Sequence, residues 1–256
     1  MNRIYKRLIF ILLYQDGYWC ISRNFRIQRI GGLDWLKVNY GFECIAGYID
    51  ELIVLNVSKS TGVTDKLFLQ AVREITEKCF VPVTVGGGIK SLQDCEKLFR
   101  EVADKICVNR IMQLNAGFIH SIADLYGAQS IVGSIDVALK KERYVVVGSG
   151  LNGREDQSLS HNIEYLASLP IGECLIQSID RDGTGYGLDL NLVDSIGTRL
   201  PHPVIIAGGL GKKSHLSDGL RHSSVDAVAT AHLLNFVGNG LETSRLHAIE
   251  SGCQLP

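Results

Sequence analysis

The chain has 256 residues, of which 46% are hydrophobic and 21% are charged, which is the composition of an ordinary globular protein. The 26 Lys and Arg residues nearly balance the 27 Asp and Glu residues, so the formal net charge is −1. This balance, without long basic segments, argues against a nucleic-acid partner and against an anionic membrane surface. The length suits one large domain, and we expect a single domain over residues 1–256.

The cysteines and the first apolar run indicate a cytoplasmic protein. The seven cysteines are scattered, without a C-x-x-C pair, and the seven histidines show no metal-ligand spacing. This pattern is typical of reduced thiols, and we expect neither a metal nor a cofactor. Residues 8–14 follow Arg3, Lys6 and Arg7, as in a signal peptide, but seven residues cannot span a bilayer and no cleavage site follows. We therefore interpret them as a buried strand before an Asp16-Gly17 turn.

Eight short apolar, β-branched runs alternate with longer helical patterns, which is the signature of repeated β-α units around a parallel sheet. With no polar linker between them, the runs predict a closed (β/α)8 TIM barrel. An open, doubly wound sheet is the alternative fold. The predicted strands cover residues 7–14, 51–57, 82–85, 105–108, 130–136, 173–179, 203–207 and 226–230.

An internal repeat favours the barrel. It predicts two half-barrels of four strands each, over about 1–125 and 126–256, with the functional residues at the carboxyl ends of the strands. A spacing of 122 residues recurs between Glu51 and Glu173, between Gly86-Gly87 and Gly208-Gly209, and between Asp104 and Asp226.

Glycine-rich segments directly after predicted strands are candidate phosphate loops. Glycines there let the backbone approach an anion, and the next helix offers free N–H groups. The segments at 86–88 and 208–209 lie in corresponding places of the two halves, so they predict two phosphate sites on opposite rims. Residues 180–184 form a third such segment. Tight turns without a ligand remain the alternative for all three.

Motifs over almost the whole chain carry a family resemblance. The sequence resembles the cyclase subunit of imidazole glycerol phosphate synthase, and SIDRDGT is the most specific of the matching motifs. They are KRLI at 6–9, DG at 16–17, DEL at 50–52, VGGGI at 85–89, ADK at 103–105, SID at 134–136, SIDRDGT at 178–184 and AGG at 207–209.

The resemblance implies a duplicated β/α barrel that pairs with a glutamine amidotransferase subunit. In that family, ammonia released by the glutaminase passes through the barrel and attacks a doubly phosphorylated ribulosyl-formimino intermediate. The products are imidazole glycerol phosphate and an aminoimidazole carboxamide ribotide. By the same resemblance, the ligand of this chain is a phosphorylated small molecule.

The family mechanism uses two aspartates, as general acid and base on opposite sides of the substrate. Asp136 matches the second of them, but Leu13 occupies the position of the first. Leucine cannot transfer a proton, and a positioned acid or base typically contributes ~10² to 10⁴ in rate. Asp16 matches a separate aspartate of the family's Asp-Gly turn, so we do not expect it to replace the missing acid.

Other positions that face the family's substrate also differ, because a loop lysine is Ile21, a strand-end aspartate is Asn56 and a threonine is Gln177. Arg110 and His232 replace two hydroxyl residues at the phosphate sites, and a guanidinium is able to bind a phosphate through two charge-assisted hydrogen bonds. The predicted phosphate-binding set is Gly88, Asn109, Arg110, Asp182, Gly183, Gly209, Ala231 and His232.

At the opposite end of the barrel, the resemblance implies an ammonia gate of alternating charges. All four of its members are present as Arg7, Glu51, Lys105 and Glu173, each at or next to the start of a predicted strand. A salt-bridge plug that only caps the barrel floor is the alternative. Because buried charge pairs stabilise a fold little, a complete gate beside a lost acid suggests that ammonia passage is the retained function.

The leading hypothesis is therefore a diverged paralogue of the cyclase subunit that docks on a glutaminase and conducts ammonia. Paralogues of this kind accompany bacterial surface-polysaccharide pathways in which a sugar acetamido group becomes an amidine. The alternatives are an authentic histidine-pathway cyclase that uses another acid, and a non-catalytic scaffold for the glutaminase. The sister isomerase of the same pathway is less consistent with the sequence, because it needs no ammonia gate.

Overall fold

A computed structural model describes residues 5–40, 46–77, 79–148, 156–231 and 240–256. Within these ranges, eight parallel strands close into a barrel, because β7 pairs with β6 on one side and with β10 on the other. This closure confirms the predicted (β/α)8 barrel. The strands of the barrel are β1 (Arg7–Gln15), β4 (Glu51–Asn56), β5 (Val83–Gly86), β6 (Lys105–Val108), β7 (Ile131–Lys140), β10 (Glu173–Ser178), β11 (Val204–Ala207) and β12 (Ala227–Thr230).

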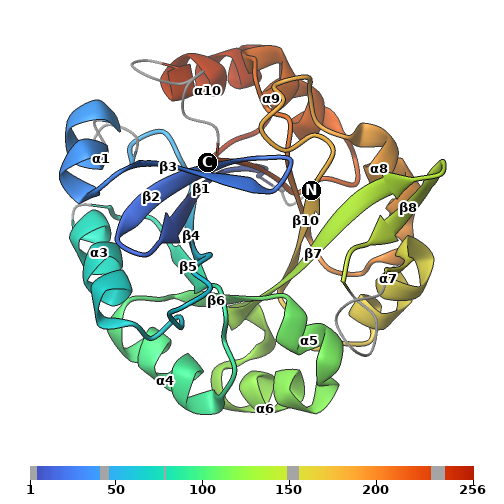
Figure 1. Cartoon of the computed structure of the whole chain (residues 1–256). Helices are drawn as coiled ribbons and strands as arrows, with labels where there is room; N and C mark the ends of the chain where they lie inside the picture. Colours follow the sequence, from blue (N-terminus) through green and yellow to red (C-terminus); the bar gives the residue numbers. More distant parts are fainter. Residues whose placement is uncertain (1–4, 41–45, 78, 149–155, 232–239) are drawn as a thin grey trace.

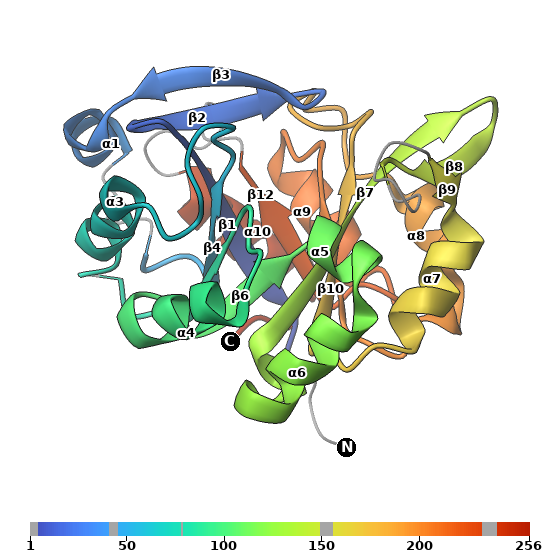
Figure 2. The ribbon, with the colours of Figure 1, turned by 60° about the horizontal axis from the view of Figure 1, so that its bottom comes forward.

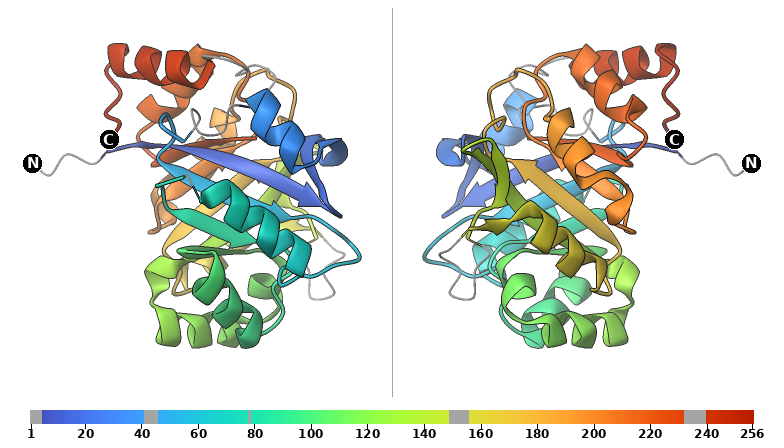
Figure 3. Two further views of the ribbon diagram at one scale, coloured as in Figure 1. Left: turned by 90° about the vertical axis from the view of Figure 1, so that its left-hand side faces the viewer. Right: turned by 90° about the vertical axis from the view of Figure 1, so that its right-hand side faces the viewer.

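Helices form a ring around the barrel, as the view along its axis and the two side views show (Figures 1 and 3). Their apolar faces and the outward faces of the strands make one large buried core, while a second apolar cluster fills the barrel interior. Each described helix is too short or too polar to cross a membrane. The helices are α1 (Leu33–Tyr40), α3 (Lys66–Thr76), α4 (Leu92–Glu101), α5 (Arg110–Leu114), α6 (Ala116–Tyr126), α7 (Leu159–Ala167), α8 (Leu190–Ile196), α9 (Lys213–Arg221) and α10 (Gly240–Glu250).

Local sequence explains where several helices begin. The Asp65 carboxylate accepts hydrogen bonds from the N–H groups of Leu67 and Phe68 at the start of α3, and Ser91 and Asp94 form a reciprocal capping box at the start of α4. These side chains satisfy N–H groups that have no partner within the helix. These caps fix where α3 and α4 begin. They therefore fix the ends of the loops that run from β4 to α3 and from β5 to α4 at the barrel mouth.

Two antiparallel hairpins were not predicted from the sequence. Strands β2 (Tyr18–Arg23) and β3 (Arg26–Gly31) follow β1, and Figure 2 shows this hairpin lying across one end of the barrel. Asp16 and Gly17 both have positive φ values, of 50° and 91°, as the tightest hairpin turns require. The predicted Asp16-Gly17 turn is thus confirmed. Strands β8 (Arg143–Val146) and β9 (Gln157–Ser158) extend β7 in the same way.

The two halves of the barrel correspond in detail, with one correction to the spacing. The Asp104 carboxylate accepts a hydrogen bond from Val83 N–H at 2.8 Å, and Asp226 does the same for Val204 at 2.8 Å. Among the glycines, however, the residues that correspond are Gly87 and Gly208, with φ of 102° and 101°. Their spacing is 121 rather than 122, because the second half has one residue fewer before its glycine loop.

Gly87 is packed too closely to be replaced. A Cβ atom there would lie 2.0 Å from the Asn56 carbonyl oxygen, whereas a Cβ atom on Gly88 would have nothing within 4 Å. Both have positive φ, so Gly88→Ala should lose only the ~1–2 kcal/mol of left-handed strain. Gly87→Ala should lose at least ~2 kcal/mol more. Urea unfolding of the two variants checks this difference, and equal losses would contradict the close approach.

Candidate functional site

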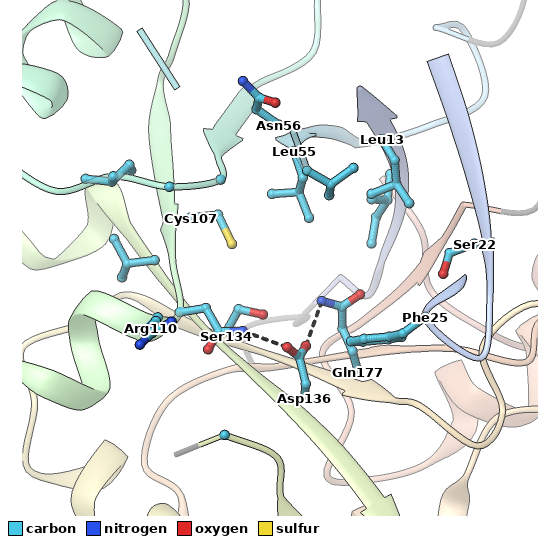
Figure 4. Close-up of a pocket in the computed structure, with 18 of the residues that line it drawn as sticks. Leu13, Ser22, Phe25, Leu55, Asn56, Cys107, Arg110, Ser134, Asp136 and Gln177 are labelled. Atoms are coloured by element: carbon cyan, nitrogen blue, oxygen red, sulfur yellow. Dashed lines mark hydrogen bonds between the residues drawn. The ribbon is translucent and has the colours of Figure 1, made fainter. Parts of the chain in front are cut away.

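A pocket of about 450 Å³ lies at the carboxyl ends of the barrel strands, under the β2–β3 hairpin. Figure 4 shows that its two walls differ. Leu13 of β1 and Leu55 of β4 form an apolar wall, and across the cavity lie Asp136 of β7 and Gln177 of β10. The structure thus brings the predicted catalytic aspartate into a pocket at the barrel mouth, as expected for this fold.

Two amide groups hold the Asp136 carboxylate. Asn109 Nδ2 donates to its Oδ2 at 2.9 Å, and Gln177 Nε2 donates to its Oδ1 at 3.3 Å. Burial raises the pKa of Asp136 to about 6, although the Asn109 hydrogen bond opposes this shift and the negative charge of Asp182 adds to it. A carboxylate that titrates near neutrality, in a cavity, is typical of a group that transfers protons.

Leu13 stands where the resemblance places the other proton-transfer residue. Its side chain is 8% exposed and belongs to the apolar cluster inside the barrel. The carboxylate of Asp16 does not turn into the pocket, because it accepts hydrogen bonds from Ser60 Oγ at 2.8 Å and from Arg29 at 3.1 Å. Among the described residues, Asp182 is the other carboxylate in the pocket wall.

Asp182 holds the hairpin that covers the pocket. Its Oδ2 accepts the Ser22 hydroxyl at 2.6 Å and the Phe25 N–H at 3.0 Å, and its backbone oxygen accepts the Asn24 N–H at 3.0 Å. Gly183 is in van der Waals contact with the same hairpin, since a Cβ atom there would lie 2.4 Å from the Ser22 carbonyl oxygen. These long-range contacts had no signal in the sequence.

The first predicted phosphate loop opens onto the pocket. Gly87 and Gly88 both have positive φ and line the cavity. Arg110 is exposed at the rim, and its guanidinium makes no ion pair with any described side chain. Asn109 has another role as well, because its amide oxygen accepts from Gln113 at 3.1 Å while its amide nitrogen donates to Asp136.

The second predicted loop is tighter. Gly183, Gly209 and Ala231 line a separate cavity of about 30 Å³, which Ser22 and Phe25 of the hairpin also contact. This cavity is much smaller than the main pocket of about 450 Å³. His232 lies outside the described residues.

The structure also places the other residues that differ from the family pattern. Ile21 lies on β2, paired with Gln28 of β3, and Asn56 closes its own loop by donating to the Gly62 carbonyl at 3.0 Å and accepting from Ser58 N–H at 3.0 Å. Gln177 instead reaches Asp136. Of these three residues, Gln177 is therefore the one that contacts Asp136, the predicted catalytic aspartate.

Four charged side chains meet at the opposite end of the barrel. Arg7 contacts Glu51 and reaches Glu173 at 2.7 Å, while Lys105 reaches Glu51 at 3.0 Å and Glu173 at 2.6 Å. Each carboxylate bridges both cations, so the four form a closed ring of alternating charge. Burial alone would raise the pKa of Glu173, but hydrogen bonds and charges from Arg7 and Lys105 lower it. All four predicted gate residues are thus brought together at the amino ends of their strands.

Ser134 was missed as a site residue. It lies two residues before Asp136 on β7, so its side chain also points into the barrel, and this spacing was the available signal. The side chain is 2% exposed, lines the pocket, and its hydroxyl has no hydrogen-bond partner. The neighbouring Cys107 thiol stays protonated, because burial raises its pKa to about 12. No group of His, Cys, Asp and Glu side chains in the described ranges is placed to hold a metal ion.

Comparisons with known proteins identify the family. A model described as histidine biosynthesis protein matches residues 44–238. The chain belongs to this family. The chain is 45% identical to a protein of Parasynechococcus marenigrum (strain WH8102), and the match covers 95% of this chain and 90% of the relative. That relative is provisionally described as imidazole glycerol phosphate synthase subunit hisF2. The chain is also similar to imidazole glycerol phosphate synthase subunit HisF of Chlorobium phaeobacteroides (strain BS1), at 34% identity over 98% of both chains, and of Chlorobium phaeovibrioides (strain DSM 265 / 1930), at 32% over 96% and 97%.

The raised pKa of Asp136 predicts a pH-dependent stability. Because its pKa is 3.8 in the unfolded chain and about 6 in the fold, the fold binds the proton more tightly, and stability falls as pH rises from about 4 through about 6. Relative to Asp136→Asn, the wild-type free energy of unfolding should fall by up to about 3 kcal/mol between pH 4 and pH 7. Urea titrations at several pH values measure this difference, and a constant difference would contradict the shift.

Proposed function

We propose that this barrel receives ammonia at its floor from a glutamine amidotransferase subunit and delivers it to a phosphorylated acceptor at its mouth, in the cytoplasm. The closed ring of Arg7, Glu51, Lys105 and Glu173 is the observation that carries the proposal. The proposal treats the chain as a diverged member of the cyclase lineage, with its two half-barrels forming one domain.

The ring is hard to explain as a device for stability. Moving four charges away from water costs much of what their attraction returns, and apolar side chains of similar size often serve a fold equally well. The side chains of Arg7 and Lys105 remain 21% and 19% exposed, so the ring is reachable from outside the floor. In the proposed function, a ring of both signs at the floor suits the control of a small polar molecule.

The interior above the ring supports passage of a neutral species. An apolar cluster that includes Ile53, Val132, Leu175 and Ala229 fills this interior. An ammonium ion would lose its hydration there at a high cost in free energy, whereas neutral ammonia loses far less. This order of a charged floor, an apolar interior and a polar pocket supports delivery of ammonia toward Asp136.

The residues at the barrel mouth support a reaction that has diverged from the cyclisation of the family. The family resemblance calls for two aspartates, and Leu13 provides no proton donor. By the same resemblance, the acceptor would belong to surface-sugar amidination, with the acetamido group bound in this barrel or in a third protein. An authentic cyclase is the second candidate, because Asp136 and its Asn109 partner are present and the relatives at 32% and 34% identity carry the HisF name.

Restoring the missing acid separates these two functions. With ammonium salt and the ribulosyl-formimino intermediate, we expect the wild type to turn over slowly. Leu13→Asp should raise the rate, but by less than the ~10² to 10⁴ of a positioned acid in a complete site, because Gln177 also differs. Leu13→Asn has a similar shape without the acid and should gain nothing. Fast turnover by the wild type, or full recovery by Leu13→Asp, would favour the authentic cyclase.

Docking of a glutaminase is tested on opposite faces of the barrel. Phe80 is 96% exposed near the start of β5 at the floor, and Leu139 is 49% exposed near the end of β7 at the mouth. Size-exclusion and calorimetry with a glutaminase subunit of this family should show a complex that Phe80→Asp weakens at least tenfold, since an unpaired buried charge is costly, and that Leu139→Asp leaves unchanged.

The origin of the nitrogen then tests passage. When the complex of the Leu13→Asp variant receives amide-15N glutamine in unlabelled ammonium buffer, its product should carry mainly 15N. A product labelled like the medium would refute conduction and leave a scaffold role for the barrel.

A further inference from the structure

The charge of Asp136 is stabilised by hydrogen bonds rather than by an ion pair. Among the described residues, no Lys or Arg side chain forms an ion pair with this carboxylate. The wall that faces it, with Leu13 and Leu55, is apolar, and the negative charge of Asp182 opposes its ionisation. Asp136 therefore depends on neutral hydrogen-bond donors to stay charged in this pocket.

Two amides supply these donors from opposite sides of Asp136. Strand β7 lies between β6 and β10, Asn109 directly follows β6, and Gln177 belongs to β10. Asn109 Nδ2 donates to Oδ2 and Gln177 Nε2 donates to Oδ1, so each carboxylate oxygen has one amide partner (Figure 4). Donors on both sides oppose rotation of the carboxylate, while each oxygen keeps a lone pair for a ligand.

The sheet itself sets the place of Gln177. In the parallel pairing of β10 with β7, Gln177 is the direct partner of Asp136, and side chains at such paired positions project to the same face. A side chain on a strand is placed more precisely than one on a loop. Asn109 is fixed in another way, because Gln113 donates to its amide oxygen at 3.1 Å.

We propose that Gln177 is a positioning residue for Asp136: its amide keeps the carboxylate turned toward the pocket and in the ionised form that accepts a proton. The use of this base rests on the proposed function. There, the lone pair of ammonia forms the C–N bond, and one N–H bond of the resulting cationic nitrogen breaks as its proton moves to Asp136. The contact between the two side chains requires no ammonia.

Few other charged groups face Asp136. Among the described residues that line its pocket, the other titratable side chains are Cys107 of β6, Arg110 at the start of α5 and Asp182, which follows β10. Within the described ranges, β1, β4 and the β2–β3 hairpin add none to this lining. Burial raises the pKa of the Cys107 thiol to about 12, so this thiol stays protonated while Asp136 titrates.

NMR titration of the full chain, without glutaminase or ammonia, tests this role. In a chain with 13C-labelled aspartate carboxyl groups, the resonance that Asp136→Asn removes reports the ionisation of Asp136. Gln177→Met keeps the length of the side chain without its amide. It should raise the pKa of Asp136 from about 6 to about 7, because a hydrogen bond to the charged form is lost.

Two further variants connect the change to the contact. Gln177→Glu keeps the shape but places a second carboxylate beside Oδ1 of Asp136, and it should raise the pKa above that in Gln177→Met, since like charges oppose ionisation. Gln28→Met makes the matched exchange on the exposed strand β3 and should leave the titration unchanged. A residue that only fills space would not move this midpoint.

Two results would overturn the inference: an Asp136 that titrates in Gln177→Met as it does in the wild type, or one that titrates no higher in Gln177→Glu than in the wild type. Each variant decides the question alone, so the test survives if the other fails to fold. If docking of the glutaminase or passage of ammonia fails while these shifts hold, the proposed function falls and the role of Gln177 toward Asp136 stands.

Discussion

The twofold alternation of side chains along each barrel strand is the constraint on which both ends of this molecule depend. Side chains separated by an even number of residues point to the same face of a strand. Arg7 and Leu13 therefore both face the barrel interior from β1, as Glu173 and Gln177 do from β10. A slip of one residue in either strand would turn its floor charge and its mouth residue outward together.

The two ends of these strands differ in what they do for stability. Leu13 is buried among apolar neighbours, and full burial of such a side chain stabilises a fold by roughly 1.5–3 kcal/mol. The ring charges return little net free energy, and removing one of them leaves its partners uncompensated. A leucine at this position of the mouth is thus favourable to the fold, whereas loss of a single charge from the floor is costly.

Much of the fold was predictable from the sequence, because buried parallel strands are short, apolar and β-branched. The predicted strands at 105–108 and 51–57 agree with the observed ones to within one residue. The β2–β3 hairpin was missed, since its exposed strand Arg26–Gly31 buries little surface and has no clear apolar alternation. The one-residue shift of the second glycine loop was missed for another reason. Short motifs show that a pair of glycines recurs in both halves. Which glycines correspond depends on backbone contacts, such as that of Gly208 with Ser178.

The site, like the fold, was predictable only in part from the sequence. Asp136 and the four floor charges follow from motifs at strand ends, and the structure brings them where those motifs imply. The link between Ser22 and Asp182 joins residues 160 positions apart, and no local pattern encodes such a pair. The amide of Gln177 on Asp136 required a register between β7 and β10 that only barrel closure sets.

The electrostatics of Asp136 limit which reaction a mouth of this kind performs. With a pKa of about 6, the carboxylate is mostly ionised at pH 7 and is therefore able to accept a proton. Ammonia that attacks an electrophilic carbon becomes positively charged and has to lose a proton, which a single base is able to take. Ring closure with loss of a leaving group also needs an acid, and Leu13 offers none. In the proposed function, one base and two amide donors therefore suit the addition of ammonia to an acceptor, whereas the cyclisation that the family resemblance implies calls for two aspartates.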